Sequence, residues 1–285
     1  FIHYHHPASM SYNDYIKYSM FMKKHFNYFV TKSTNGEYFK HYKHNLNYIK
    51  MLLINLKSYF ILKCLNKSKG VFVLSEFAKQ ECQRYVSSKI YNLKGAFNEN
   101  FLDNIKLNSK IYKSDQNKLL VIARLDVNKR VDVIIKSMQL LNEEGYDYLS
   151  LDIVGDGPEY NNLNNLIKNN RLFNCHIYKN LNDAQLNNKI INCNVFITID
   201  WGDYTLTSME ALAYGKKIVV SYDAKFDKKI EENSQIFYTE PQPVSLSRTI
   251  KKAIKTKTNN NFSNNYLKEY TWENYINQIS TVVYK

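Results

Sequence analysis

The chain has 285 residues, of which 44% are hydrophobic, and a formal net charge of +13. This length and apolar content suffice for two domains with cores of their own and exclude a disordered chain. The four cysteines form no C-x-x-C pair, which argues against a zinc ribbon or disulfide framework and favours a reducing, cytoplasmic compartment. No transmembrane helix is expected, because Lys57 and Lys63 interrupt the most apolar stretch.

The positive charge is concentrated in the first part of the chain. Residues 1–103 contain 15 Lys and Arg against 6 Asp and Glu. A basic surface attracts nucleic acid, anionic membranes or phosphorylated substrates, and an AT-rich genome would also enrich a chain in Lys and Asn. Because the sequence has no RNP, KH or helix-turn-helix pattern, a nucleic-acid partner is not expected.

The first hundred residues are predicted to form part of an α/β domain. The segment FIHYHHP (1–7) has the pattern of a strand that runs into a loop, and the start at Phe1 indicates that the first strands of this domain are absent. VFVLSEFAKQECQRY (71–85) predicts a strand, a turn and a helix, with Ser75 as the N-cap. The polar residues 103–117 are predicted to be a linker.

From Lys118 onward, short apolar runs alternate with helical patterns. Strands are predicted at 118–123, 149–154, 176–178, 195–199 and 218–221. Helices are predicted with Pro158 near the first position of one of them, over 183–191 with Asp183 as the cap, and over 207–214. A further helix is predicted from its apolar stripe, Val131, Ile134, Ile135, Met138 and Leu141. This alternation predicts a parallel sheet covered on both faces, a Rossmann-like doubly wound domain that binds ligands at the carboxyl ends of its strands. The tail is predicted to be a helix anchored by Trp272.

Two cations follow the first strand of this domain. Arg124 and Lys129 lie in the loop before the helix, at the edge where open sheets bind ligands. Arginine offers a bidentate fork for phosphate oxygens and lysine a point charge, so the pair could bind a diphosphate. A solvated surface turn is the alternative explanation.

A second candidate anion site lies at the start of a later helix. The amino end of this helix is built by Tyr204, Thr205, Leu206, Thr207 and Ser208, with Glu210 close behind. Free amides and the positive end of the helix dipole favour an anion there. Glu210 could then bind the ribose hydroxyls of a nucleotide, although a surface acid that stabilises the dipole would look the same.

Three motifs in this order resemble a known family. R-L-D-x-x-K, then IVGDGPE, then TSMEALAYGKKIVVS are similar to the C-terminal domain of the GT-B retaining glycosyltransferases of family 4, the glycosyl transferases group 1. The resemblance implies an α/β protein with the GT-B fold, two Rossmann-like doubly wound domains that face a cleft, the N-terminal one partial. The implied parts are an acceptor-side domain (1–103), a nucleotide-sugar-binding domain (104–265) and a C-terminal helix (266–285) that packs back toward the N-terminal domain.

The resemblance also implies residue roles. Arg124 and Lys129 match the catalytic cations that bind the donor diphosphate, and Glu210 matches the second glutamate of an E-x7-E motif, which binds the ribose. The place of the first glutamate holds Gly202. Asp203 is the preferred substitute for it, and Asp200 is the other candidate.

The remaining implied site residues lie in three segments. Gly157 and the run Tyr204, Thr205, Leu206 and Thr207 match donor-binding positions. FIHYHHP resembles an H-x-H-[ED]-P segment, which makes His5 the catalytic residue that orients the sugar or acceptor, with His3 as the fallback. The histidines near this segment could also hold a metal, but no acidic or thiol ligand accompanies them, and the family needs no metal or other cofactor.

The implied function is the transfer of a hexose with retention. The donor would be of the GDP-mannose or UDP-glucose type, and the acceptor a glycan or a lipid-phosphate-linked glycan. The basic first part suggests peripheral contact with the anionic inner face of a membrane. The alternative is a non-catalytic, GT-B-like nucleotide-sugar-binding subunit or sensor, which Gly202 favours.

Overall fold

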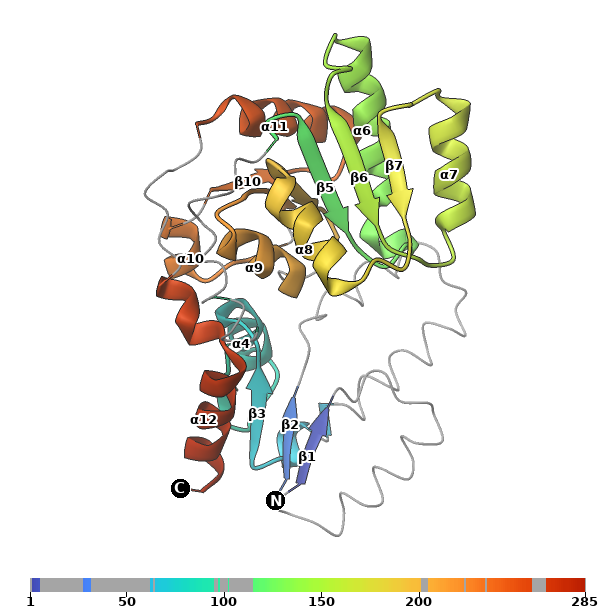
Figure 1. The fold of residues 1–285 in the computed structure, drawn as a ribbon. Helices are drawn as coiled ribbons and strands as arrows, with labels where there is room; N and C mark the ends of the chain where they lie inside the picture. Colours follow the sequence, from blue (N-terminus) through green and yellow to red (C-terminus); the bar gives the residue numbers. More distant parts are fainter. Residues whose placement is uncertain are drawn as a thin grey trace, which may run out of the picture. The chain divides into compact units, whose positions relative to one another are not determined.

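A computed structural model describes residues 2–5, 28–31, 62–63, 65–94, 97, 102, 115–200, 205–222, 224–233, 235–257 and 265–284 (Figure 1). The chain divides into two units, Phe1–Ala96 with Glu269–Lys285, and Phe97–Lys268. The expected boundary near residue 103 lies outside the described residues. No helix within the described ranges is long and apolar enough to cross a bilayer.

The first unit contains a parallel sheet in the order β1-β2-β3-β4. The strands are β1 (Ile2–His5), β2 (Tyr28–Thr31), β3 (Gly70–Val73) and β4 (Ile90–Asn92). Helix α4 (Glu76–Gln83) follows β3. The Ser75 hydroxyl accepts a hydrogen bond from the Ala78 amide at 3.0 Å, which confirms the predicted N-cap.

The C-terminal helix α12 (Trp272–Val283) belongs to this first unit. Tyr275 packs with Phe72 and Leu93 in a buried cluster. The prediction of Trp272 as the anchor is wrong, because its side chain is 50% exposed. The Thr271 N-cap places Trp272 in the first turn, so the next residue of the inward-facing row, Tyr275, is buried instead.

The second unit contains a six-stranded parallel sheet in the order β10-β9-β8-β5-β6-β7. The strands are β5 (Lys118–Ile122), β6 (Ser150–Val154), β7 (Cys175–Tyr178), β8 (Val195–Thr198), β9 (Lys217–Ser221) and β10 (Ile236–Thr239). The first strand lies in the middle and the winding reverses between β5 and β8, so the predicted doubly wound, Rossmann-like topology is confirmed. This reversal is the switch point, where such sheets bind ligands.

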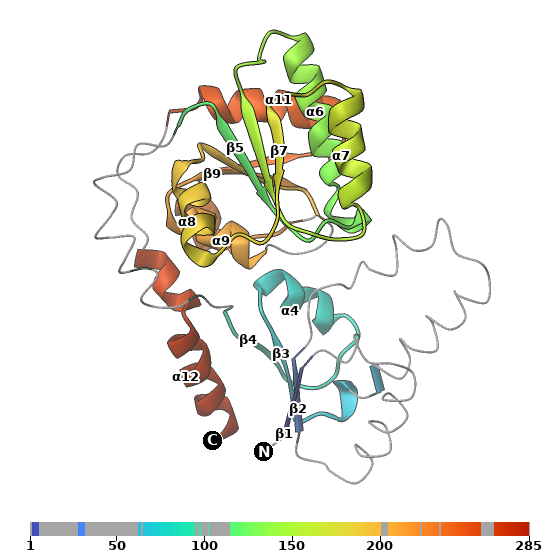
Figure 2. The same ribbon diagram turned by 45° about the vertical axis from the view of Figure 1, so that its right-hand side comes forward.

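Helices cover both faces of this sheet (Figures 1 and 2). One face carries α6 (Val131–Glu143), α7 (Tyr160–Asn169) and α11 (Pro243–Lys255). The other carries α8 (Asp183–Asn192) and α9 (Leu206–Ala213). The shorter elements are η4 (Val127–Lys129), α10 (Lys228–Asn233) and η5 (Asn265–Tyr270). The predicted apolar stripe of α6 is buried, which places the core between α6 and the sheet.

Helix α8 begins differently from the prediction. Its N-cap is Asn182, whose side chain accepts a hydrogen bond from the Gln185 amide at 2.9 Å. The Gln185 side chain in turn accepts one from the Asn182 amide at 3.0 Å. This reciprocal capping box satisfies two amides, whereas Asp183 becomes the first helical residue, so the prediction of Asp183 as the cap is wrong.

Two adjacent lysines donate hydrogen bonds to carbonyls at the C-terminal ends of helices on opposite faces of the sheet. Lys217 donates to the carbonyls of Ala253, in α11, at 3.0 Å, and of Thr256, its C-cap, at 2.8 Å. Lys216 donates to the carbonyl of Ile191, in α8, at 2.5 Å. Consecutive residues at a strand point to opposite faces, so one dipeptide satisfies carbonyls at the ends of both helices.

Candidate functional site

The switch point of the second unit contains a small cavity where four segments meet. It is lined by Val121, Ile122, Ala123, Lys129, Ile134, Ile197, Thr198, Asp200 and Thr205. The loop after β5 therefore brings Lys129 to the same place as Thr205, the residue that begins α9. The cavity volume is about 10 Å³, room for roughly one water molecule, so it marks the meeting point of these elements and not a complete ligand site.

Lys129 forms an ion pair at the end of β8. Its Nζ lies 2.5 Å from Oδ2 of Asp200, whose Oδ1 accepts a hydrogen bond from the Thr198 hydroxyl at 2.8 Å. The Ser221 hydroxyl donates to the Asp200 carbonyl at 3.1 Å. The Asp200 side chain is only 11% exposed, so its charge depends on Lys129 for compensation. Sequence reasoning considered Asp200 only as a substitute for the missing glutamate and missed this pairing.

The loop that carries Lys129 is fixed at both ends. Asp126 caps η4 and accepts a hydrogen bond from the Asn128 amide at 3.1 Å. Arg130 adopts the left-handed conformation, with φ of 50°, and donates from Nη1 to the Ile199 carbonyl at 3.2 Å. These contacts hold the loop against the end of β8. Neither contact was predicted from the sequence, although an Asp two residues before the Asn128 amide is a capping signal.

Arg124 lies in the same loop but outside the cavity. Its side chain is 74% exposed, and its Nε lies 3.8 Å from Oδ2 of Asp126. Lys129, and not Arg124, therefore lines the same cavity as Thr205, the N-cap of α9. The exposed guanidinium is accessible to a ligand at the carboxyl edge of the sheet.

The start of α9 offers hydrogen-bond donors. Thr205 is the N-cap, and its hydroxyl accepts a hydrogen bond from the Ser208 amide at 3.2 Å. None of the described residues accepts a backbone hydrogen bond from the amides of Leu206 or Thr207. Two amides with no backbone acceptor in the part of the chain that the structure describes, and the positive end of the helix dipole, thus lie at the cavity that Lys129 lines, an arrangement that binds anions.

Glu210 lies on α9 one turn further along the helix. Its side chain is half-buried, and its carboxylate has no hydrogen-bond or ion-pair partner in the part of the chain that the structure describes. Burial raises the pKa of this carboxyl above its ordinary 4.5, and the charge of Asp183 raises it further. An unpaired, half-buried acid destabilises a fold, so residues of this kind occur mainly at binding and catalytic sites.

We expect Glu210→Gln to stabilise the protein at pH 7 while it weakens nucleotide binding. Because the folded-state pKa is raised, the contribution of Glu210 to stability is present in full below pH 4.5 and is lost as the pH rises through the raised pKa. Thermal melting should therefore give a higher Tm for the variant at pH 7, with a smaller difference toward pH 4. Replacing a charged acceptor by a neutral one should weaken UDP binding roughly tenfold. A lower Tm at pH 7 would contradict this account of Glu210.

Gly157 allows two loops of the site to lie in contact. A Cβ at this position would lie 2.3 Å from the carbonyl oxygen of Leu125 and 2.8 Å from its carbonyl carbon. The Leu125 amide donates to Asp156 at 2.9 Å, and the Glu159 amide donates to Leu125 at 3.0 Å. The loop after β6 is therefore joined to the loop after β5, which gives this predicted donor-binding residue a structural role.

The other predicted site residues are only partly covered by the structure. Asp203 and Tyr204 lie outside the described residues, as does Gly202. His5 is the last residue of β1 and so ends an edge strand of the first unit, but its side chain is not described. Their roles stay predictions.

Comparisons with solved structures give the same fold throughout. A sucrose-phosphate synthase from Thermosynechococcus elongatus matches with a TM-score of 0.74 and 15% identity, over 99% of this chain and 72% of the other. A glycosyltransferase from Rickettsia africae matches with a TM-score of 0.63 and 15% identity, over 95% and 80%. Anabaena HepE, in complex with UDP and glucose, matches with a TM-score of 0.63 and 13% identity, over 95% and 81%.

The sequence itself matches one family model. No curated protein sequence matches the chain significantly. The model of the glycosyl transferases group 1, however, matches residues 104–269, more than half of the chain and nearly all of the second unit. The chain therefore belongs to the glycosyl transferases group 1 and is a glycosyltransferase with the GT-B fold.

Proposed function

We propose that this glycosyltransferase moves a hexose, with retention of configuration, from a UDP-glucose or GDP-mannose type of donor to a glycan or lipid-linked glycan. The observation that carries this proposal is the meeting of Lys129 and the start of α9 at the switch point between β5 and β8. Doubly wound sheets bind nucleotides at this position. The presence of UDP and glucose in the HepE structure, which has the same fold, supports a nucleoside diphosphate sugar as donor.

Each residue has a separate role in this proposal. Lys129 and the amides of Leu206 and Thr207 bind the diphosphate, and Arg124 reaches it from the exposed side of the loop. Negative charge grows on the departing diphosphate as its bond to the sugar breaks, and these preorganised groups stabilise it. Glu210 accepts hydrogen bonds from the ribose. The acceptor hydroxyl oxygen forms its bond to the anomeric carbon on the face from which the diphosphate departs, and the hydroxyl proton passes to the departing diphosphate oxygen.

Asp203, Tyr204 and His5 complete the proposed site. Asp203 contacts the donor sugar in place of the glutamate that Gly202 replaces, and the Tyr204 segment lies against the donor. His5, from the first unit, orients the sugar or the acceptor. Asp203→Ala and His5→Ala should then lower turnover more than they lower UDP affinity, because neither residue touches the nucleotide.

The proposed chemistry requires no metal ion, because cations and helix amides neutralise the diphosphate. We expect that dialysis against EDTA leaves the rate of sugar transfer unchanged within a factor of about two, a difference below 0.5 kcal/mol in the barrier. A loss of activity that returns with Mg²⁺ or Mn²⁺ would show that the site depends on a metal.

A thermal-shift screen tests the donor proposal. UDP, GDP and ADP, each with its hexose derivatives, are added at saturating concentration, and uridine and guanosine serve as controls without a diphosphate. At a hundred times its dissociation constant, a ligand adds about 2.7 kcal/mol of stability. We expect a shift with one nucleoside diphosphate and little with its nucleoside. Equal shifts with the nucleoside diphosphate and its nucleoside would show that the base alone determines the affinity, and would contradict the diphosphate site. Release of sugar in a turnover assay would exclude the alternative of a non-catalytic subunit.

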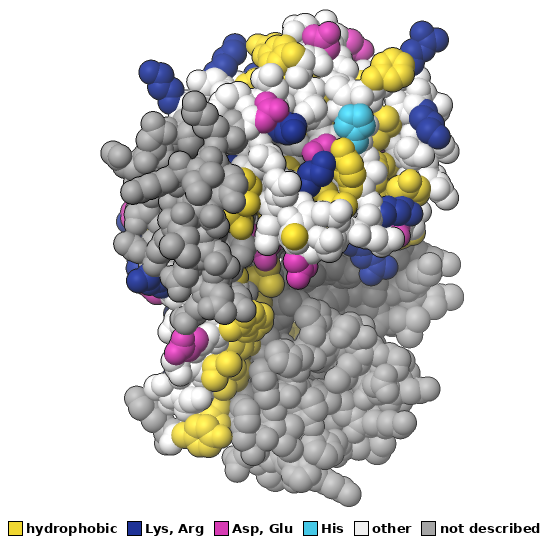
Figure 3. All heavy atoms as spheres, viewed as in Figure 1, with side chains coloured by type: hydrophobic (Ala, Val, Ile, Leu, Met, Phe, Trp, Pro, Cys, Tyr) yellow, Lys and Arg dark blue, Asp and Glu magenta, His cyan; other side chains and the backbone are white. Residues whose placement is uncertain are grey.

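We also propose that the protein is cytoplasmic and that its first unit binds peripherally to the anionic inner face of a membrane. Figure 3 shows hydrophobic side chains along α12. Trp272, Ile276 and Tyr284 are 50%, 58% and 83% exposed. Aromatic and aliphatic side chains of this kind enter the interfacial layer of a membrane, and the excess of Lys and Arg in residues 1–103 would attract its anionic lipids.

A vesicle assay tests the membrane proposal. The protein should bind phosphatidylserine vesicles at low salt, and removing one inserted side chain by Trp272→Ala should weaken binding roughly tenfold, because burial of a large apolar side chain contributes about 1.5 kcal/mol or more. Val244→Ala is the matched control, since Val244 is 49% exposed but belongs to the second unit. Absence of binding at low salt, or equal loss in both variants, would contradict the proposal.

A further inference from the structure

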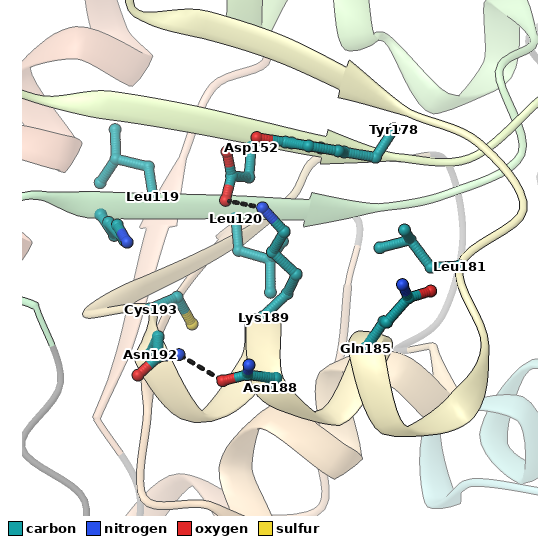
Figure 4. A pocket seen from close by; sticks show the side chains of 11 residues that line it. Leu119, Leu120, Asp152, Tyr178, Leu181, Gln185, Asn188, Lys189, Asn192 and Cys193 are labelled. Carbon is teal, nitrogen blue, oxygen red and sulfur yellow. Dashed lines mark hydrogen bonds and ion pairs between the residues drawn. The ribbon is translucent and has the colours of Figure 1, made fainter.

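A second, larger cavity lies between α8 and the sheet, away from the switch point. Its volume is about 410 Å³, within the range of pockets that hold small ligands. It is lined by Lys118, Leu119, Leu120, Asp152, Tyr178, Leu181, Gln185, Asn188, Lys189, Asn192 and Cys193. Figure 4 shows Leu120 of β5 and Lys189 of α8 facing each other across this space, whereas Leu119, the neighbour of Leu120 on β5, belongs to the core on the opposite face of the sheet. None of them lines the switch-point cavity, so the α8 groove, as we name it, is a separate site.

The helix wall of the α8 groove is polar. In α6, on the opposite face of the sheet, the row Ile134, Ile135, Met138 and Leu141 is fully buried against the strands. In α8, the row with comparable helical spacing is Gln185, Asn188, Lys189 and Asn192. Gln185 and Asn188 are exposed, and the buried residue of α8 is Ile190, so the polar row does not pack on the sheet. It borders an open groove, in which its amides can reach a ligand.

The charges in the α8 groove compensate one another. Lys189 Nζ lies 2.8 Å from Oδ2 of Asp152 and 3.6 Å from the ring centroid of Tyr178. Burial by itself would lower the pKa of Lys189, but the interactions with Asp152 and Tyr178 outweigh it and raise the pKa, so the lysine stays charged and paired. Lys118 lies 3.8 Å from Asp115. With its cations paired, the groove favours an uncharged ligand over a phosphate.

Several polar atoms of the α8 groove, both donors and acceptors, have no hydrogen-bond partner among the described residues. Asn192 donates to the Oδ1 of Asn188, which leaves the Asn188 amide nitrogen as a free donor and the Asn192 oxygen as a free acceptor. The Gln185 side-chain oxygen is used by the capping box, so its nitrogen is also a free donor. The second carboxylate oxygen of Asp152 is a free acceptor. A hydroxyl group both donates and accepts, so neighbouring hydroxyls match this set of donors and acceptors.

We propose that the α8 groove is a carbohydrate-binding site for a neutral saccharide, distinct from the donor site. The amides of Asn188, Asn192 and Gln185 bind the hydroxyls. The C–H face of the sugar ring packs on Leu181, a half-exposed leucine that lines the groove. The site goes beyond the proposed transfer reaction, because it binds a saccharide without the nucleotide and could hold a glycan chain while another part of it reacts.

Ligand-observed NMR on the wild-type chain tests the proposal. Maltotriose, cellotriose, mannobiose and N,N′-diacetylchitobiose are probed separately by saturation transfer, with saturating UDP present to occupy the donor site. We expect saturation transfer to at least one probe, unchanged by UDP, and backbone amide shifts in labelled protein that are confined to α8 and strands β5 to β7. No transfer to any probe at millimolar concentration, or displacement by UDP, would overturn the proposal.

Two neighbouring asparagines of α8 provide a matched pair of variants. Asn188 lines the groove, whereas Asn187 does not. Asn188→Ala should raise the dissociation constant of the bound probe about tenfold, and Asn187→Ala should leave it unchanged. Equal affinities in the two variants would place the saccharide elsewhere. The amide shifts of the wild-type protein decide the question independently if either variant is unstable.

Discussion

Lys129→Met should abolish nucleotide binding and also destabilise the second unit. The substitution keeps most of the side-chain volume but removes the partner of Asp200, whose side chain is 11% exposed. Breaking a buried pair from one side leaves an uncompensated charge, and we expect a loss of about 3 kcal/mol in the free energy of unfolding. Urea denaturation measures this loss, and isothermal titration with UDP measures the binding.

The double variant Lys129→Met/Asp200→Asn separates the two effects. With both charges removed, the free energy of unfolding should return to within about 1 kcal/mol of the wild type, because a neutral pair has no charge to compensate. UDP binding should stay lost, since the diphosphate still lacks its cation. Recovery of UDP binding together with stability would show that Lys129 serves only the fold.

Gly157→Ala should destabilise the carboxyl edge of the sheet by about 3 kcal/mol, the upper end of the usual range for overpacking. The new Cβ would lie 2.3 Å from the Leu125 oxygen and 2.9 Å from the Leu125 nitrogen, and both are backbone atoms that cannot rotate away. The loops after β5 and β6 would have to separate. Because the first of these loops also carries Lys129, UDP affinity should fall as well.

Gly145→Ala is the matched control for this substitution. Gly145 has φ of +82°, but a Cβ there would meet no atom within 4 Å. The control should lose only the energy of placing alanine in a left-handed conformation, about 1 kcal/mol, and should keep its UDP affinity. A loss at Gly157 no greater than at Gly145 would show that the contact between the two loops is not tight in solution.

The architecture of the second unit could be predicted because the local hydrophobic pattern of each segment agrees with the strand or helix that the segment forms. Apolar runs and helical stripes alternate, and the α6 stripe buried against the sheet is the one that periodicity predicts. Errors arose where two residues compete for one role. Asn182 is the N-cap in place of Asp183 because Gln185 completes the capping box. Tyr275 is the anchor in place of Trp272 because Trp272 lies in the first turn, directly after the N-cap Thr271, and stays exposed there.

The candidate site was predictable in place but not in detail. A strand end followed by cations, and a helix start rich in hydroxyl residues, indicated Lys129 and Thr205, and the topology brings them together. The pairing of Lys129 with Asp200 joins residues 71 positions apart, and no local pattern encodes a contact over that separation. The α8 groove is similar, because the row of amides is visible in the sequence but the space beside it arises only when α8 lies on the sheet.

A crystal structure of the protein with UDP would show where the diphosphate binds. The account predicts that the diphosphate lies at the switch point between β5 and β8, within hydrogen-bond distance of Lys129 Nζ and of the amides of Leu206 and Thr207. It also predicts that the ribose hydroxyls donate to Glu210. A diphosphate bound at another edge of the sheet, or a Lys129 that contacts Asp200 alone while UDP is bound, would contradict it.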